Sequence, residues 1–264
     1  MWMRTAASAG CSRSKMEIFI YCSYTGSWTE ERVIRAAQSL PPLRRERMER
    51  YQRWEDRRES AAAALLTAYA LLAAEKEPPG PPQPTVIAAD DLLTAETAAV
   101  SLALDWTPGE GGKPFEQGLL WGKTRRFVSL SHTRGAVAAA VADQPVGVDI
   151  ERLDAAAPHT VRAILRRFHP LERELLEPLA EEQLADRFPV WWTLKESVMK
   201  LTGQGFRLPL SMFYVLPETP PDEKSPAGRE IFTGCWSGGD IRLYSWPLSP
   251  YRLSVAFEKE NHNQ

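Results

Sequence analysis

The order of the predicted elements occurs twice along the chain, and this repeat constrains the fold more than any other feature. A short strand rich in β-branched and aromatic residues is followed by helices and then by strands, and the same order returns in the second half. We therefore expect an α+β fold, a pseudo-two-fold repeat of two similar α/β halves. Each half should contain a small, mainly antiparallel sheet that is packed by helices.

The first half begins with a strand at Glu17–Cys22 and a helix that Ser27 or Thr29 caps. A long helix is predicted next, over about residues 43–76. Its first part is rich in arginine, whereas residues 61–74 are almost entirely apolar, so we expect the helix to be exposed early and buried late. A proline-rich loop ends this helix, because proline lacks the amide proton that a helix interior needs. The remaining predictions for this half are a helix at 90–104 and strands at 127–131 and 136–142, separated by a turn at 131–135.

The second half begins with a strand at Val146–Glu151. Its further predicted elements are helices within 158–201 and strands near 212–216, 230–235, 241–246 and 252–257. We expect the two halves to span residues 16–143 and 144–258. Residues 1–15 are expected to be a disordered extension, and residues 259–264 a tail.

Composition excludes several classes of protein. The 264 residues carry a net charge of −2, which gives no overall reason to expect a nucleic-acid partner. No apolar run reaches the roughly 18–20 residues that a membrane span needs, so no membrane association is expected. Cys11, Cys22 and Cys235 are isolated, which predicts neither a disulfide framework nor a zinc site and favours a cytoplasmic location.

Two acidic residues mark the strand that opens the second half. Side chains at i and i+2 share one face of a strand, so Asp149 and Glu151 should point the same way while Ile150 turns into the core. Two such carboxylates repel each other unless a positive group lies between them. They are compatible with a divalent metal site, but also with an exposed strand end or with pairing to an arginine.

A third acid lies on the predicted helix that follows. Glu196, Lys200 and Trp192 fall on one helical face because they are four residues apart. Gly203 and Gly205 mark the end of the helix directly after these charges. This turn should be partly buried, where an unpaired acid is costly. Magnesium prefers carboxylate oxygens and keeps substrate phosphates in its remaining positions, so Glu196 is a further candidate metal ligand. A simple surface ion pair beside a buried tryptophan is the alternative.

Several positive groups could meet a phosphate-bearing substrate. They are Lys113 before Pro114, His132 in the predicted turn, and the arginines of the long helix. Each also has a simpler explanation: a loop lysine, a hydrogen-bonded turn residue, and a solvated helix face.

Together these segments resemble the larger, monomeric, Sfp-like class of 4′-phosphopantetheinyl transferases. The matching segments are Gly112-Lys113-Pro114 for the family's G-K-P, Phe127 to Thr133 for F-N-x-S-H-S, Val146 to Glu151 for G-x-D-x-E, Trp192 to Lys200 for W-x-x-K-E-[SA]-x-x-K, and Leu201 to Phe206 for the G-x-G segment. The second motif departs from the family pattern, since Phe127-Val128 and Ser129 replace its usual F-N start. The resemblance spans roughly residues 16–257 and is strongest between residues 112 and 206.

The resemblance implies a magnesium-dependent enzyme of the holo-[acyl-carrier-protein] synthase type, with manganese as an alternative ion. Such an enzyme transfers the 4′-phosphopantetheine arm of coenzyme A to a serine of an acyl- or peptidyl-carrier protein and releases 3′,5′-ADP. It serves fatty acid, polyketide or nonribosomal peptide synthesis as a monomer. The implied magnesium ligands are Asp149, Glu151 and Glu196, and the implied catalytic residues are Glu196, Lys200 and Asp149. The implied coenzyme contacts are Lys113, Pro114, Ser131, His132, Arg44, Arg47, Ser60 and Lys200.

The resemblance assigns the nucleotide to the first half and the metal to the second. It leaves the general base open, because Glu196 or a metal-bound water could take the serine proton. One alternative is a nucleic-acid-binding protein whose arginine-rich helix follows phosphates. Another is an inactive interaction module, against which the intact Asp149, Glu151, Glu196 and Lys200 argue.

Overall fold

The computed structural model describes residues 16–107, 109, 114–115, 117–153, 158–218, 228–237 and 239–259. Three expectations therefore fall outside the described residues: the extension at 1–15, Lys113, and most of the tail.

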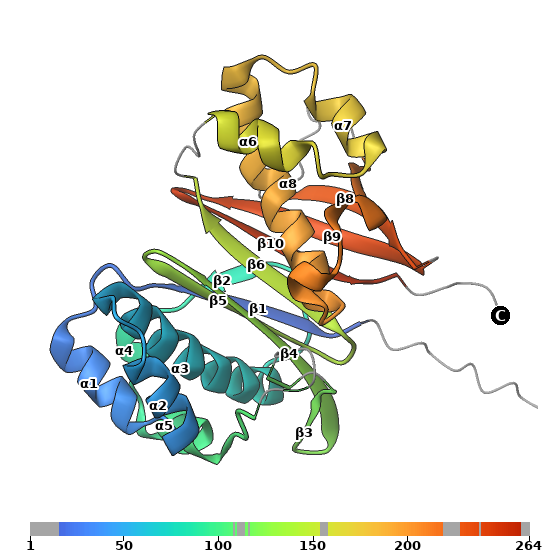
Figure 1. The fold of residues 1–264 in the computed structure, drawn as a ribbon. Helices are drawn as coiled ribbons and strands as arrows, with labels where there is room; N and C mark the ends of the chain where they lie inside the picture. Colours follow the sequence, from blue (N-terminus) through green and yellow to red (C-terminus); the bar gives the residue numbers. More distant parts are fainter. Residues whose placement is uncertain are drawn as a thin grey trace, which may run out of the picture.

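Two five-stranded sheets form the centre of the molecule (Figure 1). The first has the order β2-β1-β5-β4-β3 and the second the order β6-β10-β9-β8-β7. All neighbouring strands are antiparallel except β1 and β2. The strands are β1 (Ile18–Tyr24), β2 (Pro84–Val86), β3 (Leu119–Trp121), β4 (Thr124–Thr133), β5 (Ala136–Ala142), β6 (Val146–Arg152), β7 (Tyr214–Pro217), β8 (Glu230–Trp236), β9 (Gly239–Leu248) and β10 (Tyr251–Glu258).

The two sheets repeat one connection pattern. In the first sheet, the opening strand β1 pairs with β5, the last strand of its meander, and in the second sheet β6 pairs with β10 in the same way. One long helix precedes each meander. The predicted α+β fold with two similar halves is therefore confirmed.

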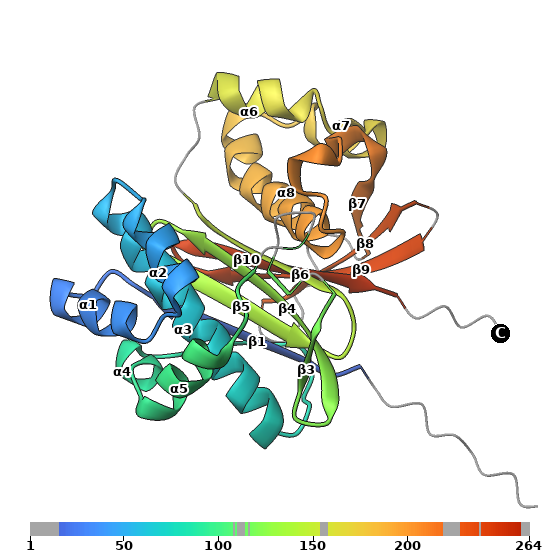
Figure 2. The same cartoon turned by 60° about the horizontal axis from the view of Figure 1, so that its bottom comes forward.

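Helices cover the outer faces of both sheets, as two views of the ribbon show (Figures 1 and 2). They are α1 (Glu30–Gln38), α2 (Pro42–Glu49), α3 (Trp54–Lys76), α4 (Ala89–Leu92), α5 (Ala95–Ala103), α6 (Pro158–Leu165), α7 (Pro170–Leu176) and α8 (Glu181–Leu201), with short 3-10 turns η1 (Gly205–Arg207) and η2 (Leu210–Met212). No helix among the residues described above is long and apolar enough to cross a membrane.

The single long helix predicted for residues 43–76 is wrong. The chain forms α2 and α3 instead, and Arg53 between them has an extended backbone. The break has a packing reason, because α2 is polar and buries only Arg44 and Met48, whereas α3 buries most of its length. Turning the chain at residues 50–53 lets α2 lie beside α3. The predicted helix at 90–104 is likewise split into α4 and α5.

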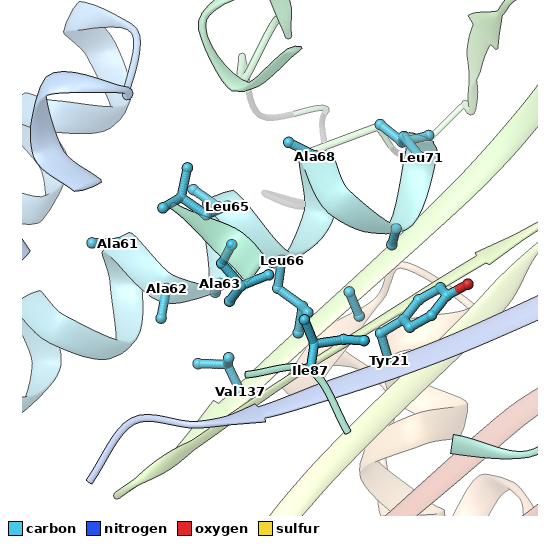
Figure 3. Packing of buried hydrophobic residues seen from close by; sticks show 14 of the residues in the cluster. Tyr21, Ala61, Ala62, Ala63, Leu65, Leu66, Ala68, Leu71, Ile87 and Val137 are labelled. Atoms are coloured by element: carbon cyan, nitrogen blue, oxygen red, sulfur yellow. The ribbon is translucent and has the colours of Figure 1, made fainter. Parts of the chain in front are cut away.

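Strand β5 is buried on both faces because it lies between two layers. Val137, Ala139 and Val141 join the core under α3, while its alternate alanines join the core between the sheets. Ala62, Ala63 and Leu66 of α3 belong to the first of these cores (Figure 3). Small side chains let a helix and a second sheet approach the same strand.

The turn predicted at 131–135 is shorter than expected. Strand β4 continues to Thr133, and only Arg134 and Gly135 make the turn, with Gly135 at a φ of +88°. The hydroxyl of Tyr251 would lie 2.5 Å from a Cβ at Gly135, so only glycine fits there. His132 therefore lies on a strand rather than in a turn, and this fixes its direction.

Candidate active site

The candidate site lies where β4 of the first sheet runs beside β6, the edge strand of the second. We call this strip the seam. Three hydroxyls at alternate positions on β4 reach across it: Ser129 Oγ accepts from the amide of Val148 at 3.0 Å, Ser131 Oγ donates to Asp149 Oδ1 at 2.8 Å, and Thr133 Oγ1 donates to Glu151 Oε2 at 3.1 Å. Side chains two residues apart share one face of a strand, so one face of β4 supplies all three contacts.

Asp149 is the centre of the site. It is buried on β6, and its Oδ1 accepts from Ser131 and from Lys200 Nζ, the latter at 2.6 Å. Lys200 Nζ also donates to Ser131 Oγ at 2.6 Å. Asp149 Oδ2 is buried and has no hydrogen-bond partner among the described residues. A buried carboxylate oxygen without a partner is costly, so it is an available ligand for a cation.

Glu151 and Glu196 lie close enough to Asp149 to be affected by its charge. Burial and the Asp149 carboxylate raise the pKa of Glu151. Burial raises the pKa of Glu196 to about 7, and Asp149 and Glu151 add to that rise. The indole of Trp192 donates to Glu151, and Lys200 contacts Asp149. The face of α8 that carries Trp192, Glu196 and Lys200 is therefore turned toward β6. The four-residue spacing of these side chains places them on one face of the helix.

The donor set fits a divalent cation in its chemistry. Carboxylate oxygens are the ligands that magnesium prefers, and one of them is buried and unsatisfied. Among the described residues, however, no group of three or more Asp, Glu, His or Cys side chains is already arranged to hold an ion. Instead, the ammonium group of Lys200 forms an ion pair with Oδ1 of Asp149. The three-carboxylate metal site thus stays a prediction.

The raised pKa of Glu196 predicts a pH-dependent cost to the fold. Its pKa is about 7 in the folded state and 4.5 ordinarily, so the folded protein holds a proton that the unfolded chain releases between these values. Stability should fall as pH rises through this window. Without added metal, Glu196→Gln should raise the melting temperature at pH 8 by several degrees and leave it nearly unchanged at pH 4. Thermal unfolding of both proteins checks this, and an equal shift at both pH values would contradict it.

Basic groups from the first sheet and from α2 face the same region. His132 is solvent-exposed on β4, and its pKa is lowered by partial desolvation and by the nearby charges of Lys200 and Arg44. Arg44 is buried over the ring of Trp106 at 4.8 Å, and burial lowers its pKa to about 10. Trp106 in turn packs edge-on against Phe115, which follows Pro114. These contacts bring Phe115, two residues after Lys113, close to Arg44.

The other predicted nucleotide contacts differ in exposure. Arg47 is exposed on α2. Ser60 is buried in α3 without a hydrogen-bond partner for its hydroxyl among the described residues, while its carbonyl accepts from Arg44 Nη2 at 3.3 Å. Ser60 therefore contacts Arg44 through its backbone carbonyl. Three other arginines bond within the fold: Arg45 to the carbonyls of Ala37 and Leu40, Arg57 to the Tyr51 carbonyl, and Arg58 to Glu59. The arginines therefore do not form one free stripe.

One ion pair beside the site has no counterpart in the sequence prediction. Lys195 precedes Glu196 in α8, yet it is fully buried on a different face of the helix. Its ammonium donates to Glu172 Oε2 at 2.8 Å and to the carbonyls of Leu210 and Phe213 at 2.7 Å each. Successive helical residues are about 100° apart, so one turn can serve both the core and the site. The motif marks Lys195, but nothing in the sequence identifies Glu172 as its partner.

Parts of the chain match known proteins. Residues 145–256 match the model of the 4′-phosphopantetheinyl transferase superfamily. A 4′-phosphopantetheinyl transferase of Bacillus subtilis is 32% identical over 130 residues, which are 47% of this chain and 55% of that protein. The transferase psf-1 of Bacillus pumilus is 41% identical over 87 residues, 32% of this chain and 35% of the relative. Sfp of Bacillus subtilis strain 168 is 33% identical over 87 residues, 33% of this chain and 38% of the relative.

The chain is thus an α+β protein with two sheets, and residues 145–256 of its second half match the 4′-phosphopantetheinyl transferase superfamily model. The relatives that the chain matches include Sfp itself, as the motifs predict. The alignments span only about half, or less, of the length of these three relatives.

Proposed function

We propose that this chain transfers the 4′-phosphopantetheine arm of coenzyme A to a serine of a carrier protein. The observation that carries the proposal is the environment of Asp149: one oxygen held by Lys200 and Ser131, the other buried without a partner, and two further carboxylates beside it. Such a cluster suits a cation and a phosphate-bearing substrate together. The family match supports the choice of coenzyme A and a carrier protein.

In the proposed reaction, the serine oxygen attacks the phosphorus that carries the pantetheine arm. The bond from this phosphorus to the bridging pyrophosphate oxygen breaks, and 3′,5′-ADP leaves with that oxygen. Asp149, Glu151 and Glu196 would hold magnesium, which when bound neutralises pyrophosphate charge. Lys200 supplies a fixed positive charge beside the same carboxylates and can stabilise the leaving phosphate. Glu196, with a pKa near neutrality, is also suited to receive the serine proton.

The nucleotide would lie against the first half of the chain. Arg44, Arg47 and His132 can meet its 3′-phosphate. Further contacts would come from Lys113, Pro114 and Ser131. The backbone carbonyl of Ser60 accepts a hydrogen bond from Arg44 and so helps to hold its guanidinium in place. Both halves line the proposed site within one chain, so we propose that the protein acts as a monomer. Light scattering at the assay concentration tests this, and a dimer would contradict it.

Mass transfer tests the proposed function. Incubation of the protein with coenzyme A, magnesium and an apo-carrier protein should add the phosphopantetheine mass to the carrier. We expect Glu196→Ala to slow this transfer by about 10²–10³-fold, because it removes a carboxylate that the reaction needs. Glu182→Ala, an exposed glutamate in the first turn of the same helix, is the control and should keep the wild-type rate. Full activity of Glu196→Ala would show that Glu196 is not part of the active site. If the wild-type protein transferred the arm to no carrier protein, the proposed function would be wrong.

A further inference from the structure

Thr133 contacts Glu151 from the opposite side of the seam. Its hydroxyl donates to Glu151 Oε2 at 3.1 Å, and both side chains are only partly buried. Ser131 makes the corresponding contact to Asp149, but Ser131 also bonds Lys200 and so belongs to the catalytic cluster itself. Among the described residues, Thr133 contacts the cluster through Glu151.

Glu151 benefits from such a restraint because the Asp149 carboxylate repels it. Asp149 lies two residues away on the same face of β6, and its charge acts on Glu151. A glutamate side chain has several rotatable bonds, so without fixed donors it would turn away from a second carboxylate. The restraints on it come from two different elements: Thr133 on β4 of the first sheet and the Trp192 indole on α8.

We propose that Thr133 is a positioning residue for the divalent cation: its hydroxyl fixes the Glu151 carboxylate in the orientation that lets it act together with Asp149. This inference rests on the proposed function, because it assumes that these carboxylates hold magnesium. Hydrogen-bond donors behind metal ligands typically change metal affinity by about 10–100-fold when they are removed. Thr133, like Ser131, thus links the first sheet to a proposed metal site whose ligands all lie in the second half of the chain.

Magnesium binding to the full chain in the presence of coenzyme A, measured by calorimetry, tests the proposal. Thr133→Val removes the hydroxyl and nearly keeps the shape, and we expect it to weaken magnesium binding about 10-fold or more. Thr133→Ser keeps the hydroxyl and should bind within about twofold of wild type. Thr67→Val is the matched control. Thr67 is buried in α3 and its hydroxyl bonds the Ala63 carbonyl of its own helix, so its loss should leave magnesium affinity unchanged.

The possible outcomes distinguish a failure of this inference from a failure of the proposed transfer function. Wild-type magnesium affinity in Thr133→Val, or an equal loss in Thr133→Ser, would overturn the role of the hydroxyl while the transfer activity stands. A wild-type protein that binds no magnesium with coenzyme A present would overturn the metal site and this inference with it. The melting temperature of each variant is measured alongside, and Thr133→Ala provides a second hydroxyl-free variant should Thr133→Val fail to fold.

Discussion

Lys195→Met is expected to lower the free energy of unfolding by about 3–5 kcal/mol, because it leaves the carboxylate of Glu172 buried without its counter-charge. Both side chains are fully buried, and Lys195 also satisfies the carbonyls of Leu210 and Phe213. Those carbonyls belong to the segment between the end of α8 and β7, so its anchoring should be lost as well. Denaturant unfolding of wild type and variant measures the change.

A double variant separates the unpaired charge from the lost packing. Glu172→Gln retains an oxygen that can accept from the Val215 amide, as Glu172 Oε1 does at 2.9 Å, but carries no charge. Lys195→Met combined with Glu172→Gln should therefore recover a substantial part of the stability that Lys195→Met loses. A double variant no more stable than the single one would contradict the role of the charge. Wild-type stability of Lys195→Met would contradict the importance of the pair altogether.

Gly147→Ala is expected to reduce stability by about 3 kcal/mol or more and to abolish most of the transfer activity. A Cβ at Gly147 would lie 1.9 Å from the carbonyl oxygen of Ser197 and 2.4 Å from the amide nitrogen of Leu201. Both are backbone atoms of α8, so they cannot rotate away, and the helix must move off β6. Because α8 carries Glu196 and Lys200 while β6 carries Asp149, that movement separates the parts of the site.

Gly80→Ala is the matched control, since no atom lies within 4 Å of a Cβ at that position. It should change stability by no more than about 0.5 kcal/mol and leave transfer unaffected. Thermal unfolding and the carrier mass assay together test the pair of variants. Normal activity and stability in Gly147→Ala would show that the close approach of α8 to β6 is not required.

Sequence patterns predicted much of this fold, because the strands of the two meanders carry clear apolar runs. They failed at residues 50–53, where the break between α2 and α3 depends on how α2 packs rather than on a proline or glycine. The short edge strands β2 and β3 also escaped prediction, since three residues carry no useful periodicity.

The candidate site was predictable to the extent that local spacing determines it. The two-residue spacing of Asp149 and Glu151 and the four-residue spacing of Trp192, Glu196 and Lys200 each set one face of one element. The contacts across the seam were not predictable from the residues alone, because Thr133 and Glu151 come from different sheets. The partner of Lys195 was hidden for the same reason: Glu172 lies 23 residues earlier, on another helix.

The alanine-rich strand β5 has a consequence for how substrates enter and leave. Enzymes that open about a hinge need a weak, polar contact between their lobes. Here much of the contact is an apolar layer in which β5 is completely buried between α3 and the second sheet. Separating the halves would expose that layer to water, so the two sheets should behave as one rigid body. In the proposed reaction, coenzyme A and its product would then exchange through loop and side-chain movements at the rim, without a rotation of one half against the other.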